Sequence, residues 1–135
     1  SSRWATIMTL SPNIWQFAEI DEHDEESRLR FDRTRARFIG ALVAMATGVE
    51  PHAIHARQRA TMEAALARQI AMYLAHTVFS WSMSRVGAAF DRDRTTASHA
   101  CHRVEDLRDD AQFDSLLLKL ESCARAAPLF PETKP

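Results

Sequence analysis

The side chains best suited to reading another molecule lie at the start of a predicted helix that runs from residue 94 to about residue 109. Apolar residues recur there three to four positions apart, so one stripe faces a core and the polar residues lie opposite. Those polar residues are Arg94, Thr95, Thr96, Ser98 and His99. An arginine fork fits the O6 and N7 acceptors of guanine, and a threonine methyl can pack on a thymine methyl. The two threonines could equally serve only as first-turn residues behind an Asp93 N-cap, and both interpretations stay open at this point.

A second group of polar side chains lies around another predicted helix, residues 62–78, and in the basic loop 56–61 before it. The loop arginines, Arg68 and Gln69 bring several hydrogen-bond donors to one end of this helix. Arg92 and His76 are suited to contacts with phosphates. Together these candidates are Arg57, Arg59, Arg68, Gln69, His76 and Arg92. The two groups favour a surface that binds a nucleic acid.

Helices must position these side chains, and the sequence predicts an all-α bundle that contains a helix-turn-helix. Only three residues are glycine and 46% are hydrophobic, which favours helices over a turn-rich sheet protein. Ser82 and Asp93 are suitable N-caps, and Gly48 suits the left-handed position after a helix. The predicted helices cover residues 27–47, 51–55, 62–78, 83–90, 94–109 and about 114–125.

The same spacing predicts which residues face the core. In the predicted helix 94–109, the inward stripe consists of Ala97, Ala100, Cys101, Val104 and Leu107. In and just after helix 27–47, the predicted inward residues are Phe31, Phe38, Leu42, Met45 and Val49. The other sides of that helix carry Arg28, Arg30, Arg33, Arg35 and Arg37. Such a run is usually a solvated face, and contact with DNA is the alternative.

The net charge of −1 hides a strong segregation of charge along the chain. Residues 1–27 carry a net charge of −5, residues 28–108 carry +6, and residues 109–135 carry −2. Fifteen of the seventeen basic residues are arginine, whose planar fork suits phosphates and guanine edges. A GC-rich genome would also favour arginine over lysine, but it would not segregate the charge.

Several other classes of protein are disfavoured. We find no run of 18 uncharged apolar residues and no signal-peptide core near the start, so we expect a cytoplasmic, nucleoid-associated chain without a membrane segment. Cys101 and Cys123 lie far apart and form no CxxC motif, which favours free thiols.

Catalytic and metal sites are likewise not expected. His99 and His102 are close in sequence to Cys101, but Cys101 belongs to the inward stripe, so the three should not converge on an ion. His52 and His55 are expected to be helix-surface residues. We find no arrangement typical of a nucleophile or an acid–base pair, so we expect neither an enzyme nor a cofactor.

Two segments carry a resemblance to a known family. Residues 67–75 (ARQIAMYLA) and 90–101 (FDRDRTTASHAC) resemble the hallmark of the C-terminal DNA-binding domain of the bacterial replication initiator DnaA. The resemblance runs from about Phe38 to Leu120. It implies a Trp-repressor-like helix-turn-helix that binds duplex DNA.

The family also assigns roles to matching positions. The resemblance implies that Arg94, Thr95 and Thr96 contact bases, which favours base reading over simple capping. It implies that Arg68 and Gln69 contact backbone and bases. An arginine of the preceding loop enters the minor groove in the family, and Arg59 is the nearest candidate.

The chain departs from the family pattern at several positions. Asp91 replaces a loop glycine and adds a negative charge, Ala97 and Ser98 replace larger residues, and Leu66 stands where a basic residue is common. The bound sequence should therefore differ from the replication-origin box. The 135 residues also contain no GxxxxGK[ST] phosphate loop, so we do not expect this stretch alone to melt an origin.

Three functions are compatible with these observations. The first is a stand-alone transcriptional regulator, such as an activator of a phage-like or gene-transfer-agent-type gene cluster. The second is a replication or cell-cycle regulator that competes for initiator boxes, and the third is a protein-interaction module that has lost DNA binding. We expect three parts: an apolar and acidic extension (1–26), the DNA-binding domain (27–125) and a flexible tail (126–135). The extension would mediate homodimerisation or contact with RNA polymerase or another protein.

Overall fold

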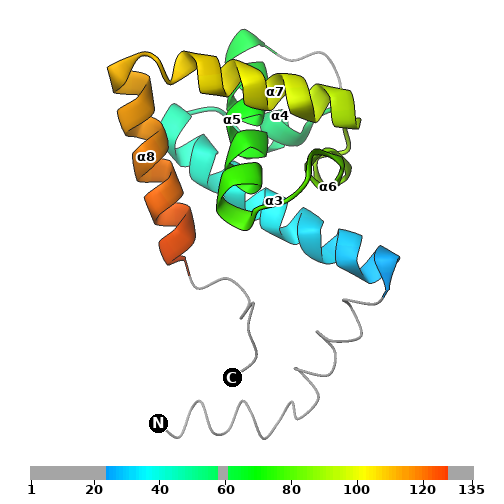
Figure 1. Cartoon of the computed structure of the whole chain (residues 1–135). Helices are drawn as coiled ribbons and strands as arrows, with labels where there is room; N and C mark the ends of the chain where they lie inside the picture. The colour runs from blue at the N-terminus through cyan, green and yellow to red at the C-terminus, as the bar shows by residue number, and fades with distance from the viewer. Residues whose placement is uncertain (1–23, 58–60, 128–135) are drawn as a thin grey trace, which may run out of the picture.

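The computed structural model of the chain describes residues 24–57 and 61–127. These residues form helices and no strands, which confirms the predicted all-α class (Figure 1). The helices are α3 (Glu25–Thr47), α4 (Pro51–His55), α5 (Met62–Phe79), α6 (Met83–Ala89), α7 (Arg94–Leu107) and α8 (Ala111–Ala126). In the described part of the chain no helix is long and apolar enough to cross a membrane.

The ends of the helices follow local chemistry. Asp24 caps α3 by accepting a hydrogen bond from the backbone N–H of Glu26, so the end of the acidic run starts a helix. Ser82 and Asp93 cap α6 and α7 as predicted, each accepting from a backbone N–H three residues ahead. Gly48 ends α3 with φ of 78°, in the left-handed region that favours glycine. The predicted extension lies outside the described residues up to residue 23, as does the tail from residue 128.

The core is built around α5, which lies between α3 and α7 near the centre of Figure 1. Ile70 and Leu74 of α5 are fully enclosed, together with Trp81 in the link to α6. Burying a side chain of this size stabilises the fold by about 1.5–3 kcal/mol. The helix-turn-helix of α6 and α7 therefore packs against a central helix whose side chains are buried in the core.

The predicted inward face of α3 is wrong by about one residue position. Ala36, Ile39 and Val43 form the buried stripe, whereas Met45 is 85% exposed. The other predicted apolar residues, Phe31, Phe38, Leu42 and Val49, are half-buried at the edge of the core. At Gly40, on the same buried side, the absence of a Cβ lets His55 of α4 pack directly against α3.

Arg35 also differs from the expectation for α3, because its side chain is buried and does not lie on a solvated face. The residue is only 6% exposed, and its guanidinium lies over the rings of Phe31 and Phe79, at 4.5 and 5.5 Å from their centroids. A planar guanidinium stacks on aromatic rings more readily than an ammonium does. Arg35 thus contributes packing.

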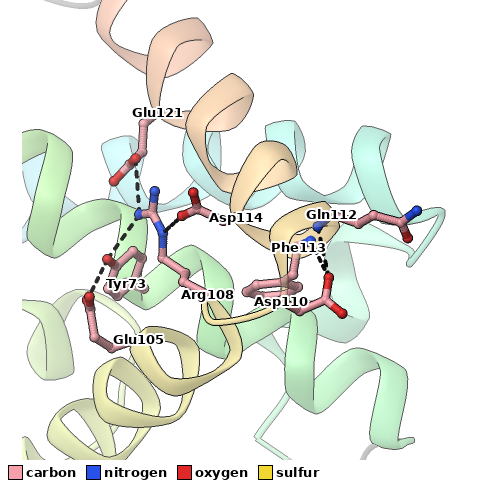
Figure 2. A network of polar contacts seen from close by, with 8 residues as sticks. All are labelled: Tyr73, Glu105, Arg108, Asp110, Gln112, Phe113, Asp114 and Glu121. Carbon is pink, nitrogen blue, oxygen red and sulfur yellow. Dashed lines mark hydrogen bonds and ion pairs between the residues drawn. The ribbon is translucent and has the colours of Figure 1, made fainter.

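A polar network fixes α8 to the rest of the domain (Figure 2). Arg108, directly after α7, donates to Asp114 at 2.5 Å, to Glu121 at 3.2 Å and to the Tyr73 hydroxyl at 3.1 Å. The same hydroxyl donates to Glu105 of α7 at 2.7 Å. The side chains of Arg108 and Glu121 are 15% and 9% exposed, so this ion pair is largely shielded from water. Three helices, α5, α7 and α8, are joined through one guanidinium.

Candidate nucleic-acid interface

The turn between α6 and α7 is as tight as a helix-turn-helix requires. The backbone N–H of Arg92 donates to the carbonyl of Gly87 at 2.7 Å. A Cβ at position 87 would lie 2.7 Å from the Arg92 carbonyl oxygen and 3.0 Å from that of Asp93. Only glycine fits there without moving the turn. Asp91 within the turn adopts a left-handed conformation with φ of 58°, which is consistent with a family pattern that has glycine at this position.

Helix α7 has the two faces that its sequence predicts. Ala97, Ala100, Cys101 and Val104 are buried against the domain, and Leu107 is half-buried. Burial, followed by the negative charge of Glu105, raises the pKa of the Cys101 thiol to about 11. On the opposite side lie Arg94, Thr95, Thr96 and His99, all exposed, and Ser98, half-buried. The outward face of the first two turns is therefore polar.

Arg94 and Thr96 differ in how free their side chains are. Thr96 donates its backbone N–H to the Asp93 carboxylate at 2.7 Å. That bond, and then one from the Thr96 hydroxyl, hold the pKa of Asp93 below its usual value. Arg94 makes no ion pair or hydrogen bond through its side chain with any other described residue. Its five N–H donors remain available to a partner.

The loop after α4 is tied to the helix-turn-helix. Arg92 donates through Nη2 to the Ala56 carbonyl at 2.6 Å, and through Nη1 to the carbonyls of Phe90 and Asp91 at 3.3 and 3.2 Å. Arg57 pairs with the Asp91 carboxylate at 2.9 Å. The negative charge that Asp91 adds to this surface is thus offset by a neighbouring arginine.

Arg68 and Gln69 lie near the same end of the domain. Arg68 donates through Nε to the Ile54 carbonyl at 2.9 Å, and burial, then the charge of Arg92, lowers its pKa. Gln69 has its Oε1 atom buried without a hydrogen-bond partner among the described residues. Arg68 therefore positions the end of α4 through one nitrogen and keeps its terminal nitrogens for other contacts.

One of the predicted residues, His76, is not brought to this cluster. The Nδ1 atom of His76 lies 2.7 Å from the Trp81 carbonyl oxygen, near the C-terminal end of α5. Eight residues of helix separate His76 from Arg68, which is about 12 Å along the axis. Arg59 lies outside the described residues.

The supporting roles of three residues were not predicted from the sequence. Arg85 of α6 forms a bidentate ion pair with the buried Asp32 of α3, at 2.7 and 2.9 Å, which anchors the helix-turn-helix to α3. His55 is half-buried rather than a surface residue, and its ring stacks on Phe90 with centroids 5.6 Å apart. Asp32 and Arg85 stand 53 positions apart in the chain, so no local pattern could pair them. Within residues 24–57 and 61–127, no group of three His, Cys, Asp or Glu side chains could hold a metal ion.

Comparison with known proteins places this geometry in a family. The family model described as bacterial dnaA protein helix-turn-helix matches residues 36–104, about half of the chain. The chromosomal replication initiator protein DnaA of Psychromonas ingrahamii is 43% identical over 65 residues, which cover 45% of this chain and 14% of that protein. The chain thus spans only a small part of that relative.

A solved structure supports the same assignment. The crystal structure of a DNA replication initiation factor superposes with a TM-score of 0.65 and 29% identity, over 88% of this chain and 37% of that one. The glycine-dependent turn, the two-faced α7 and the family match agree. The chain belongs to the bacterial DnaA helix-turn-helix family and carries a DNA-binding domain of that type.

Proposed function

We propose that the chain binds duplex DNA sequence-specifically, with the first two turns of α7 in the major groove. The observation that carries this proposal is the fork of Arg94, which pairs with no other described residue and lies on the exposed face of α7, opposite the buried Ala97 and Ala100. Recognition helices read base edges with residues near their N-termini. Arg94 would fork onto a guanine, and the methyl groups of Thr95 and Thr96 would contact thymine. Ser98 and His99 would extend this contact along the groove.

Phosphate contacts would come from the neighbouring loop and helix. Arg57 and the terminal nitrogens of Arg68 are suited to this role, and Gln69 could donate through its amide nitrogen. Arg59 would enter the minor groove, as the family resemblance implies. The guanidinium of Arg92 donates to three backbone carbonyls, so we propose that this residue stabilises the turn rather than binding a phosphate. His76 stays a predicted phosphate contact at a distance from the others.

We further propose that this binding regulates transcription. Asp91, Ala97 and Ser98 differ from the initiator pattern in and beside the reading helix, which favours a target other than the origin box. Residues 1–26 would then contact RNA polymerase or another protein, or form a homodimer. Competition with the initiator at its boxes is the second candidate, because Arg68, Gln69 and the two threonines follow the initiator pattern.

A genome-wide map of bound sites in the source organism tests this function. We expect enrichment at promoters, with transcript levels of the adjacent genes changing when the protein is removed. Enrichment at the replication origin would favour the competitor instead. Absence of enriched sites, with the protein folded and present, would contradict DNA binding and favour an interaction module.

A further inference from the structure

An open hollow lies beside the turn of the helix-turn-helix. It has a volume of about 250 Å³ and is lined by Arg33 and Arg37 of α3, His55 of α4, and Ala89, Phe90 and Asp91 at the end of α6. A water molecule occupies about 30 Å³ of liquid, so the hollow has room for a group the size of a phosphate together with water. None of the roles assigned above uses Arg33 or Arg37.

The hollow is positively charged. Arg33 and Arg37 are both exposed and lie one turn apart on the same side of α3, and neither forms an ion pair with another described residue. Among the described residues that line the hollow, Asp91 supplies the one carboxylate, and it is already paired with Arg57 at 2.9 Å. The pKa of His55 is lowered by burial and then by the charges of Arg37, Arg68 and Arg92. The part of this pKa shift that comes from the arginines is consistent with a positive potential in the hollow.

His55 is held in place as a wall of the hollow. Its ring is parallel to that of Phe90 within 11°. A Cβ at position 40 would overlap the Nε2 atom of His55, so glycine at this position lets the ring lie directly on α3. Nε2 itself is buried and has no hydrogen-bond partner among the described residues. The ring of His55 therefore packs between α3 and Phe90, and Arg33 and Arg37 line the hollow beside it.

The hollow lies close to the proposed reading helix. Asp91 precedes Arg94 by three residues, so the chain between them spans at most about 11 Å. A DNA strand carries one charge per about 3.4 Å of helix axis. A strand that passes the start of α7 would bring a phosphate to the hollow within a few nucleotides of the base that Arg94 contacts.

We propose that this hollow binds one backbone phosphate of the DNA, with the guanidinium groups of Arg33 and Arg37 as its donors. The inference rests on the proposed DNA binding and extends it, because it adds α3 to the interface. Arginine forks bind phosphate oxygens through paired, charge-assisted hydrogen bonds. The contact is independent of sequence, and it fixes the orientation of the domain on the duplex.

The experiment compares the salt dependence of binding to a random-sequence 30-base-pair duplex. The double variant Arg33→Ala/Arg37→Ala should lower the slope of log K against log salt by about 0.9, the value for one lost phosphate contact. At 0.1 M salt this corresponds to an affinity loss of about eightfold. Arg33→Lys/Arg37→Lys should keep most of the slope because it keeps both charges.

The matched control removes two exposed cations elsewhere, in Arg28→Ala/Lys119→Ala. Arg28 lies about 140° around α3 from Arg33, at 100° per residue, and Lys119 is on α8. The control should bind like wild type. Equal slopes for the Arg33/Arg37 variant and the control, with wild-type binding intact, would overturn this inference and leave the proposed function standing. A wild-type protein that binds no duplex would overturn both.

A second readout separates DNA from a free anion. In NMR titrations, the pKa of His55 should rise when the duplex is added, because a bound phosphate opposes the charge of Arg37. Inorganic phosphate alone, at millimolar concentration, should leave His55 unchanged. If inorganic phosphate shifts His55 and the duplex does not, the hollow is a small-anion site and the assignment to DNA is wrong.

Discussion

Replacing Arg108 by methionine should destabilise the domain far more than the same exchange at an exposed arginine. The guanidinium is the shared partner of Asp114, Glu121 and the Tyr73 hydroxyl (Figure 2). Methionine preserves much of the side-chain length but removes every donor. Glu121, with a side chain 9% exposed, would be left without its cation.

The magnitude follows from that unpaired carboxylate. Removing one member of a buried ion pair typically costs about 3–5 kcal/mol, because the other charge stays desolvated. For a domain of roughly 100 described residues, each kcal/mol lowers Tm by about 4 °C. We therefore expect Tm of Arg108→Met to fall by about 12–20 °C. The exposed Arg103 of α7 provides the control, since Arg103→Met should change stability by no more than about 0.5 kcal/mol.

Urea unfolding and thermal melts of four proteins complete the assay. These are wild type, Arg108→Met, Glu121→Leu and the double variant. Because the double variant leaves no unpaired charge at this pair, it should be more stable than Arg108→Met alone, with a coupling energy of about 1–3 kcal/mol. A loss below about 1 kcal/mol in Arg108→Met, or additive effects in the double variant, would refute a stabilising role for the network.

Three further predictions concern the turn and the thiol. Asp91→Gly should raise Tm, because glycine adopts a φ of 58° without strain. The same change frees Arg57 and should therefore steepen the salt dependence of DNA binding; an unchanged slope would show that Arg57 does not reach a phosphate. Gly87→Ala should lose about 1–3 kcal/mol of stability in urea unfolding through overlap with the Arg92 and Asp93 carbonyls, and a gain in stability from its better helix propensity would contradict the tight turn. Burial raises the pKa of Cys101 from 9.0 to about 11, so the thiol ionises first in the unfolded chain as the pH rises. The free energy of unfolding should therefore fall by roughly 2 kcal/mol between about pH 9 and 11. Cys101→Ala should lack this fall, and the same pH dependence in both proteins would contradict the prediction.

The parts of the fold that follow from local chemistry were predictable from the sequence. Ser82 and Asp93 cap helices because their side chains accept from N–H groups nearby, and Gly48 ends a helix because it tolerates positive φ. The stripe that includes Ala97 and Cys101 follows from a helical period that tertiary packing did not override. These features placed α7 and its exposed polar face correctly.

Features that depend on distant residues were not predictable in the same way. The inward face of α3 includes Gly40, where a Cβ would overlap His55 of α4, and no periodicity in α3 reveals that close contact. Arg92 has the side chain of a phosphate ligand, yet the Ala56 carbonyl, 36 residues away in the chain, binds it. The sequence therefore predicted which residues carry the right chemistry, but not which of them the fold already engages.

The central claim is that α7 reads bases through Arg94. Selection of bound duplexes from a random library, followed by affinity measurements on the selected site and on a random duplex, tests it most directly. We predict that wild type enriches one motif, and that Arg94→Ala weakens binding to this motif by about 1–3 kcal/mol while binding to the random duplex changes little. Failure to enrich any motif, or an equal loss of affinity on both duplexes, would contradict base reading by Arg94.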